Sequence, residues 1–169
     1  MTYDIRPVES EQELIEAFDV LGAQFPKPFT HEDRRFTDLA RRFPQDRSLM
    51  LVVEDGGLLV GGALAFRGGE AGPGCDVTLR TIALVAEHRG SGLGRRLVEC
   101  IEQEATRLGV RGIGLGADEA VGFYQHLGYR GKGGMYKALP LSSTHGDPDA
   151  RHRALKELRE RRAARRRSH

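Results

Sequence analysis

Cysteine and long apolar runs are scarce in this 169-residue chain, and each absence excludes a class of protein. The two cysteines, Cys75 and Cys100, lack the spacing of a metal site, so we expect free thiols in a reduced, cytoplasmic setting. No stretch approaches the roughly 18 apolar residues of a membrane-spanning helix. The opening residues, MTYDIRPVES, contain no apolar signal core, so we do not expect export. A composition of 39% hydrophobic and 30% charged residues suits one globular domain.

Charge is divided unevenly along the chain, although the formal net charge is only +2. Residues 150–169 hold nine Lys or Arg and two Asp or Glu, which gives this tail a charge of +7. The other 149 residues hold 17 basic and 22 acidic side chains, a charge of −5. The body is therefore mildly acidic, and the tail is strongly basic.

A glycine-rich loop joins an apolar stretch to a helical one in the middle of the chain. The apolar residues of 79–85 precede Arg89-Gly90-Ser91-Gly92-Leu93-Gly94, and apolar residues then recur at helical spacing as far as Leu108. This order predicts a strand, a tight loop and a helix. A helix start offers unpaired N–H groups and partial positive charge, and glycines allow a ligand to approach closely. We interpret Gly90 to Arg96 as a pyrophosphate cradle, to which the nearby arginines add charge.

The spacing of the glycines excludes two common phosphate loops. A P-loop needs Lys and then Ser or Thr after its last glycine, whereas Arg95-Arg96 follows here. A dinucleotide fingerprint needs G-x-G-x-x-G, and neither Gly90 nor Gly92 begins such a pattern. The remaining pattern, R-x-x-G-x-G at Arg89, Gly92 and Gly94, resembles the acyl-CoA-binding motif of the GNAT family of N-acetyltransferases. A purely structural glycine turn before a helix is the alternative.

A second motif strengthens this resemblance. Residues 116–129 read GADEAVGFYQHLGY, in which Phe123-Tyr124 and then Leu127-Gly128-Tyr129 resemble the family's second signature, F-Y-x-x-x-G-[FY]. About thirty residues separate it from the glycine loop, which leaves room for one helix and one strand. The resemblance covers residues 77–139 well, and the N-terminal third matches only in its order of elements.

The resemblance implies a three-layer α/β sandwich around a mixed, mostly antiparallel sheet, the acyl-CoA N-acyltransferase fold. The sequence patterns predict the order β-α-α-β-β-β-α-β-α-β. A capping box at Ser10 to Glu13 predicts the start of the first helix, and Thr30 to Asp33 predicts the start of the second, which Pro44 should stop. Asp55-Gly56-Gly57 predicts a hairpin turn, and Asp118 should cap the last helix of the body. Gly61-Gly62 indicates a bulge or a close backbone approach.

The same resemblance implies acetyl-CoA as acyl donor, an amine as acceptor and no metal. A backbone N–H at Leu84 or Val85 should polarise the thioester carbonyl. Tyr124 occupies the family's position for the acid that serves the departing thiolate, or else it only packs against the cofactor. The residues expected to contact the cofactor are Leu84, Val85, Arg89, Gly90, Ser91, Gly92, Leu93, Gly94, Arg95, Phe123 and Tyr124.

The general base is the component that the sequence identifies least well. Many family members carry a glutamate on the central strand, and residues 78–83 contain no carboxylate. Asp76 lies just before the strand, and Glu87 and His88 lie just after it, so these three are the candidates, with Glu87 as our named base. Each could equally be a solvated loop residue, and a water chain could remove the proton instead.

The acceptor side and the tail keep several interpretations open. Residues 25–29, FPKPF, lie between the first two predicted helices and could line an acceptor pocket or pack in the core. We divide the chain into a domain of residues 1–140, a linker of 141–149 and a basic tail of 150–169, helical or disordered. The tail could be a solvated end, pack on a neighbouring subunit through Leu155 and Leu158, or bind the phosphates of nucleic acid.

Two functions compete at this point, and a third option joins them: an acetyltransferase whose acceptor is a protein or aminoacyl-RNA amine, with the tail as docking arm. The first is an acetyl-CoA-dependent N-acetyltransferase that acts on a primary amine by direct attack in a ternary complex, either as a monomer or as the homodimer that is common in this fold. The second is a CoA-binding or nucleic-acid-associated module with the same fold and little catalysis. The missing strand carboxylate and the basic tail motivate the second.

Overall fold

The computed structural model describes residues 2–68, 76–117, 120–131, 133–140 and 148–167. The chain forms two compact units, Met1–Leu139 and Pro140–His169, and each is described by itself. Cys75 and Asp118 lie outside the described residues.

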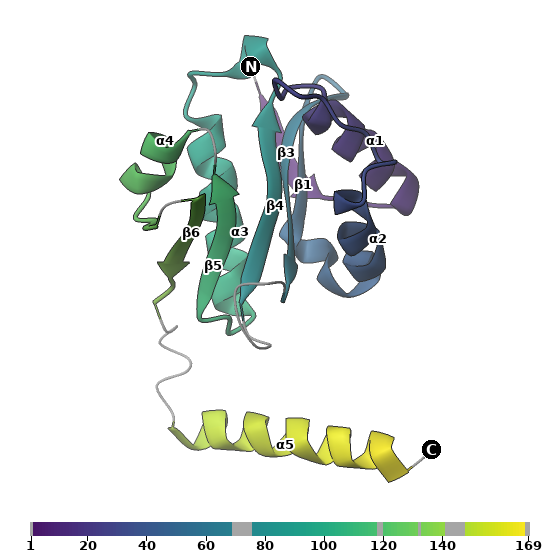
Figure 1. Cartoon of the computed structure of the whole chain (residues 1–169), viewed down its shortest axis with the longest axis vertical. Coiled ribbons are helices and arrows are strands. Elements are labelled where there is room, and N and C mark those ends of the chain that lie inside the picture. Colours follow the sequence, from purple (N-terminus) through teal and green to yellow (C-terminus); the bar gives the residue numbers. More distant parts are fainter. Residues whose placement is uncertain (1, 69–75, 118–119, 132, 141–147, 168–169) are drawn as a thin grey trace. The chain divides into compact units, whose positions relative to one another are not determined.

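The first unit is built on a six-stranded sheet (Figure 1). The strands follow chain order across the sheet, and every neighbouring pair is antiparallel except β4 and β5, which are parallel. Their bounds are β1 Tyr3–Pro7, β2 Met50–Asp55, β3 Leu58–Arg67, β4 Val77–Leu84, β5 Gly112–Ala117 and β6 Gly133–Ala138. The predicted mixed, mostly antiparallel sheet is confirmed.

Helices cover both faces of this sheet and complete the predicted three layers (Figure 1). One face carries α1 (Glu11–Gly22) and α2 (Arg35–Asp46), and the other carries α3 (Leu93–Arg107) and α4 (Val121–His126). Two short 3₁₀ helices, η1 (Arg47–Leu49) and η2 (Ala86–His88), precede β2 and the glycine loop.

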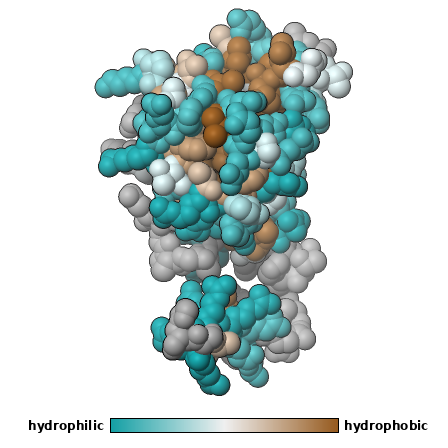
Figure 2. Space-filling view, turned by 90° about the vertical axis from the view of Figure 1, so that its right-hand side faces the viewer, coloured by the Kyte–Doolittle hydropathy of each residue, from teal (hydrophilic) through white to brown (hydrophobic). Residues whose placement is uncertain are grey.

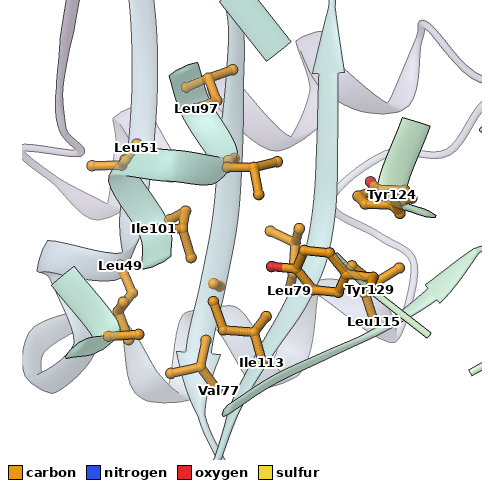
Figure 3. Close-up of a cluster of buried hydrophobic side chains, with 14 of the residues drawn as sticks. Leu49, Leu51, Val77, Leu79, Leu97, Ile101, Ile113, Leu115, Tyr124 and Tyr129 are labelled. Carbon is orange, nitrogen blue, oxygen red and sulfur yellow. The ribbon is translucent and has the colours of Figure 1, made fainter. Parts of the chain in front are cut away.

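Alternating side chains on the strands divide the core into two clusters. In β2, Met50 and Val52 belong to the cluster under α1 and α2, whereas Leu51 and Val53 belong to the cluster under α3. This alternation is the period-two pattern of a strand that is buried on both faces. Figure 3 shows the α3-side cluster, which reaches from Leu49 across the sheet to Tyr124 and Tyr129.

Local sequence signals explain most element ends, with one correction at the end of α2. Ser10 caps α1 as predicted, because its Oγ accepts the N–H of Glu13 at 3.1 Å. At α2, the N-cap Arg34 makes no side-chain cap, but Oδ1 of Asp33 accepts the N–H of Arg35 at 2.9 Å, so the predicted capping segment satisfies one N–H at the start of the helix. The prediction that Pro44 stops this helix is wrong: α2 continues to Asp46, whose carboxylate accepts from the backbone and side chain of Arg67 and anchors the last turn.

Glycines form the turn between β2 and β3 and permit close contacts within β3. Gly56 and Gly57 have φ values of 58° and 83°, as the predicted hairpin turn requires. A Cβ on Gly62 would lie 2.5 Å from the carbonyl oxygen of Leu51, so the strands approach closely there. The pairing of β2 with β3 also shifts register between Val53 and Glu54, which leaves Val60, next to Gly61, as the extra residue of a bulge.

The start of α4 has an unusual backbone, and the predicted cap, Asp118, lies outside the described residues. The N-cap is Ala120, which has φ 57°, and no described side chain caps the helix. Among the described residues, Ala120 is the one non-glycine residue with positive φ. Such a backbone costs about 1–2 kcal/mol for a residue with a Cβ.

The second unit contains helix α5, Pro148–Arg167. Its described side chains, residues 156–167, are exposed, and Leu158 is half exposed. None of the described helices is long and apolar enough to cross a membrane.

Candidate active site

The two parallel central strands separate soon after they meet. Only Val77, Thr78 and Leu79 of β4 pair with β5, although β4 continues to Leu84. At the point of separation, Arg80 has no partner on β3, because the register there passes from Thr81 opposite Leu64 to Leu79 opposite Ala65. Such a β-bulge bends a strand and increases its twist. The bulge and the end of pairing together leave an opening between β4 and β5.

The bulge places two consecutive side chains on the same face of the sheet. Leu79 and Ile82 pack in the α3-side cluster, and Ala83 packs in the cluster under α1 and α2. Arg80 pairs with Asp38 of α2, and Thr81 shares the orientation of Ala83 two residues later. Arg80 and Thr81 therefore both belong to the α1–α2 face.

The separation also leaves backbone groups of β4 without a strand partner. The N–H of Val85 is already bonded to the carbonyl of Val60 on β3 at 2.8 Å. Because antiparallel pairs alternate between bonded and non-bonded, the N–H groups of Leu84 and Ile82 point the other way, toward the opening. Of the two donors considered from sequence, Leu84 thus has the available N–H. Ile82, which the sequence argument missed, has another.

A cleft of about 700 Å³ occupies the opening. It is lined by residues 24–27 of the α1–α2 loop, residues 79–84 of β4, residues 115–117 of β5, and Arg89 and Tyr124, among others. Figure 2 looks onto the face that α1 and α2 cover and shows apolar side chains gathered among hydrophilic ones toward the upper end of the domain. The segment of residues 25–29 contributes to this cleft and also to packing, since Phe29 contacts Phe18 with ring centroids 5.1 Å apart.

The glycine loop presents free N–H groups at the start of α3. Gly90 and Gly92 have φ values of 81° and 79°, which residues with side chains rarely adopt. Gly92 is the N-cap, no side chain caps the helix, and its first turn contains no acidic residue. The Nε of Arg89 donates to the carbonyl of Leu84 at 2.9 Å and so fixes the loop to the end of β4. This end of the helix has the donors and the charge to bind a pyrophosphate.

Gly94 brings the first turn of α3 close to two other parts of the site. A Cβ built on Gly94 would lie 3.6 Å from Cζ of Phe123 and 3.9 Å from Cδ1 of Leu84. The glycine loop, the open end of β4 and the start of α4 thus meet at one end of the sheet. The ring of Phe123 is 37% exposed there and offers an apolar surface beside the loop.

Residues 14–129 match the sequence model of the Acetyltransferase (GNAT) family. The chain belongs to this family. Acetyl transfer is therefore its general activity, and the predicted family and fold are confirmed. A search of curated proteins found no match.

Solved structures show the same fold at low sequence identity. Ard1 from Thermoplasma volcanium has a TM-score of 0.66 at 17% identity, covering 83% of this chain and 99% of its own. A GNAT family acetyltransferase from Brucella melitensis, solved in complex with acetyl-CoA, has a TM-score of 0.60 at 21% identity, covering 82% and 89%. Naa50 from Arabidopsis thaliana, in complex with a bisubstrate analogue, has a TM-score of 0.62 at 16% identity, covering 81% and 99%.

Two tyrosines of the GNAT domain lie side by side, but only one lines the cleft. Tyr124 is 8% exposed and lines it, and burial raises the pKa of its phenol to about 12. Tyr129 lies with its ring centroid 5.8 Å away, and its Oη is buried without a hydrogen-bond partner among the described residues (Figure 3). Burial raises the pKa of Tyr129 as well. Both phenols are therefore protonated at neutral pH.

The three candidate bases do not line the cleft. Glu87 is exposed on η2, which turns it toward solvent, so the structure does not bring it together with Tyr124. The Nδ1 of His88 lies 3.0 Å from Oη of Tyr3 on β1. Asp76 precedes the paired end of β4, and its buried Oδ1 has no partner among the described residues. In the part of the chain that the structure describes, no group of three or more His, Cys, Asp or Glu side chains could hold a metal ion.

Proposed function

We propose that the chain is an N-acetyltransferase that moves the acetyl group of acetyl-CoA to a primary amine by direct attack in a ternary complex. The observation that supports this best is the open edge of β4, where the N–H groups of Ile82 and Leu84 face a cleft between the glycine loop and Tyr124. The pyrophosphate would lie against Gly90 to Arg95, and Phe123 would flank the cofactor's arm.

The free N–H groups would act on the carbonyl of the thioester. As the amine nitrogen bonds to the carbonyl carbon, negative charge develops on the oxygen. A backbone donor that is already fixed in the strand stabilises that charge without reorganisation. Loss of the C–S bond then gives the N-acetyl product and the CoA thiolate.

Tyr124 would serve the departing sulfur. Its pKa of about 12 keeps the phenol protonated throughout the physiological range. An ordinary thiol has a pKa of about 8.5, well below that of this phenol. The sulfur therefore leaves as a thiolate that is stabilised by a hydrogen bond from Tyr124, and the proton remains mainly on the phenol.

The proton of the acceptor ammonium would leave through water. Glu87 is exposed outside the cleft, and none of the described residues that line the cleft has a carboxylate. Replacing Glu87 with Gln should therefore change turnover by less than about twofold, because surface changes away from a site have small effects. A larger loss of turnover, with unchanged acetyl-CoA binding, would restore Glu87 as the base.

Binding and turnover measured on the full chain test this function. We expect acetyl-CoA to give calorimetric heat and to raise the thermal midpoint. A panel of primary amines should then release CoA thiol. Absence of binding would contradict the proposal. Binding without thiol release across the panel would favour the second candidate, a CoA-binding module, which the lack of a carboxylate among the described lining residues motivates.

The division of the chain is a further part of the proposal. We assign the activity to residues 1–140, with 141–149 as a linker and 150–169 as a basic tail. Truncation after Pro140 should leave turnover and acetyl-CoA affinity unchanged. If truncation also leaves retention on nucleic acid unchanged, the tail does not bind phosphates.

A further inference from the structure

Among the described residues, the charged side chains that line the cleft are all of one sign. Among the described lining residues there are four cations, Lys27, Arg35, Arg80 and Arg89, and no carboxylate. Arg89 lies beside the glycine loop and belongs to the cofactor end. The other three lie with the α1–α2 loop, the start of α2 and the bulge of β4, so they belong to the acceptor side.

Arg80 is held in place and keeps donors free. One Nη donates to Asp38 at 3.0 Å, and the guanidinium lies over the ring of Phe66, 5.4 Å from its centroid. Its Nε–H is buried and has no acceptor among the described residues. A guanidinium carries five N–H donors in a rigid fork that suits a planar anion. Arg80 is therefore fixed in position with donors left for a ligand.

Thr81 supplies the second observation. It is 6% exposed, lines the cleft, and its Oγ1 is buried with no hydrogen-bond partner among the described residues. A buried hydroxyl without a partner costs free energy, about 1–3 kcal/mol for such groups in general. The bulge places Thr81 directly beside Arg80 on the acceptor face. Two neighbouring side chains thus carry unused donors in the same cleft.

The position of this pair limits the size of the ligand. Arg80 lies two residues from Ile82 and four from Leu84, the two residues whose N–H groups we assign to the acetyl carbonyl. Residues of a strand are about 3.3 Å apart, so an anion on Arg80 and Thr81 would lie near the amine that attacks the acetyl group. The separation between the two is measured by acceptors of different length.

We propose that the acceptor is a primary amine that also carries an anionic group, in the simplest case a carboxylate, and that Arg80 and Thr81 bind this anion. The inference rests on the proposed acetyltransferase function and names its substrate class. Two sources share the chemistry: the carboxylate of a free amino acid, or the acidic first residue of a peptide. The same cations disfavour the ammonium form of the acceptor amine, which assists attack where none of the described lining residues has a carboxylate.

Matched acceptors test the proposal on the full chain. One arm compares amino acids of increasing length, from glycine to 5-aminopentanoate, with their amides, which lack the charge. The other arm compares tripeptides that begin with aspartate or with asparagine. We expect kcat/KM for the anionic member to exceed that of its neutral partner by about tenfold or more in one arm, which identifies the source.

Variants locate the preference. Arg80→Gln should reduce the ratio of anionic to neutral kcat/KM toward one, and Thr81→Val should reduce it less. Arg41→Gln, an exposed position of α2 outside the cleft, makes the same charge change and should leave the ratio unchanged. Because the ratio compares two substrates on one protein, a partly misfolded variant does not distort it. A wild-type ratio near one, or an unchanged ratio in Arg80→Gln, would overturn the proposal.

A binding assay separates this inference from the proposed function. With CoA at saturation, the anionic acceptors should raise the thermal midpoint more than their amides, and Arg80→Gln should remove that difference. If no amine releases thiol but this difference is present, the transferase function fails and the anion site stands. If thiol is released without an anion preference, the function stands and the anion site fails.

Discussion

The two walls of the cleft are built in different ways. The cofactor wall comes mainly from one continuous stretch, from the end of β4 through the glycine loop to the first turn of α3. The acceptor wall is assembled from the α1–α2 loop, Arg35 at the start of α2 and the bulge of β4, which lie tens of residues apart.

The first wall uses backbone N–H groups, and the second uses charged side chains held by partners outside the cleft. Arg35, for example, lowers the pKa of Asp33 to about 2 through a hydrogen-bonded ion pair. The proposed site for the acyl donor can thus be predicted from contiguous sequence, whereas the proposed choice of acceptor depends on tertiary contacts.

The strongest test of the cofactor wall is Gly92→Val. A branched side chain at φ 79° would displace the loop and the first N–H groups of α3. Loss of two charge-assisted hydrogen bonds weakens binding by about 100-fold or more, which calorimetry with acetyl-CoA would measure. Gly57→Val is the matched control, since Gly57 has φ 83° in the β2–β3 turn. It should cost similar stability and leave affinity unchanged; equal loss of affinity in both variants would refute a specific cradle.

Tyr124→Phe tests the point where the two walls meet. Removing the hydrogen bond to the developing thiolate should lower kcat about 10- to 100-fold. Acetyl-CoA affinity should change much less, because the interaction forms chiefly as the sulfur leaves. Steady-state kinetics and calorimetry on the same preparation separate these effects. Unchanged kcat would assign Tyr124 to packing alone.

The pH dependence of Tyr124 sharpens that test. Since its pKa is raised to about 12, the phenol stays protonated and kcat should not fall on its account below about pH 11. The free energy of unfolding depends on the same phenol, because its pKa is higher in the folded than in the unfolded chain. Its contribution to stability is complete below the unfolded pKa of about 10 and is lost as the pH rises through the folded pKa. A pH–rate profile of wild type is the measurement. A fall in kcat that begins near pH 9 and is absent from Tyr124→Phe would contradict a raised pKa.

Tyr129→Phe should stabilise the protein by a small amount. Its buried Oη has no partner among the described residues, so removing the hydroxyl should raise the free energy of unfolding by about 1 kcal/mol. It should also reduce the loss of stability above pH 10, since burial raises the pKa of this phenol too. Denaturant unfolding at pH 7 and pH 10.5 measures both effects. Tyr136→Phe, at a 40% exposed position, is the control and should change stability by less than about 0.5 kcal/mol.

Ala120→Gly should give the smallest effect. Glycine removes the steric cost of a Cβ at φ 57° but adds a cost in chain entropy. The free energy of unfolding should therefore rise by about 0.5–1 kcal/mol. Ala23→Gly is the control, because Ala23 has an ordinary helical φ of −67° and should lose stability. The thermal midpoint should rise in Ala120→Gly and fall in Ala23→Gly. A loss of stability in Ala120→Gly would show that the Cβ makes favourable contacts that exceed the strain.

Sequence patterns predicted much of the fold because the signals are local. The capping box at Ser10, the glycine turn at Gly56-Gly57 and the strand–loop–helix order around Gly92 each involve neighbours in the chain. The errors came where distant contacts compete with a local signal. Pro44 does not stop α2, because Arg67 on β3 holds Asp46 and with it the last turn of that helix.

By itself, the sequence predicted the family, which is confirmed, and it led to the proposals of acetyl-CoA as acyl donor and of the residues that would cradle it, since these follow from motifs of contiguous residues with fixed spacing. The tertiary structure decided which β4 groups are available. The N–H of Val85 is used by β3, and those of Ile82 and Leu84 are not. It also placed Arg80 and Thr81 together on one face and left Glu87 outside the cleft. The physical reason is the bulge at Arg80: one unpaired residue reverses the alternation of side chains along β4, and this depends on how β4 pairs with β3.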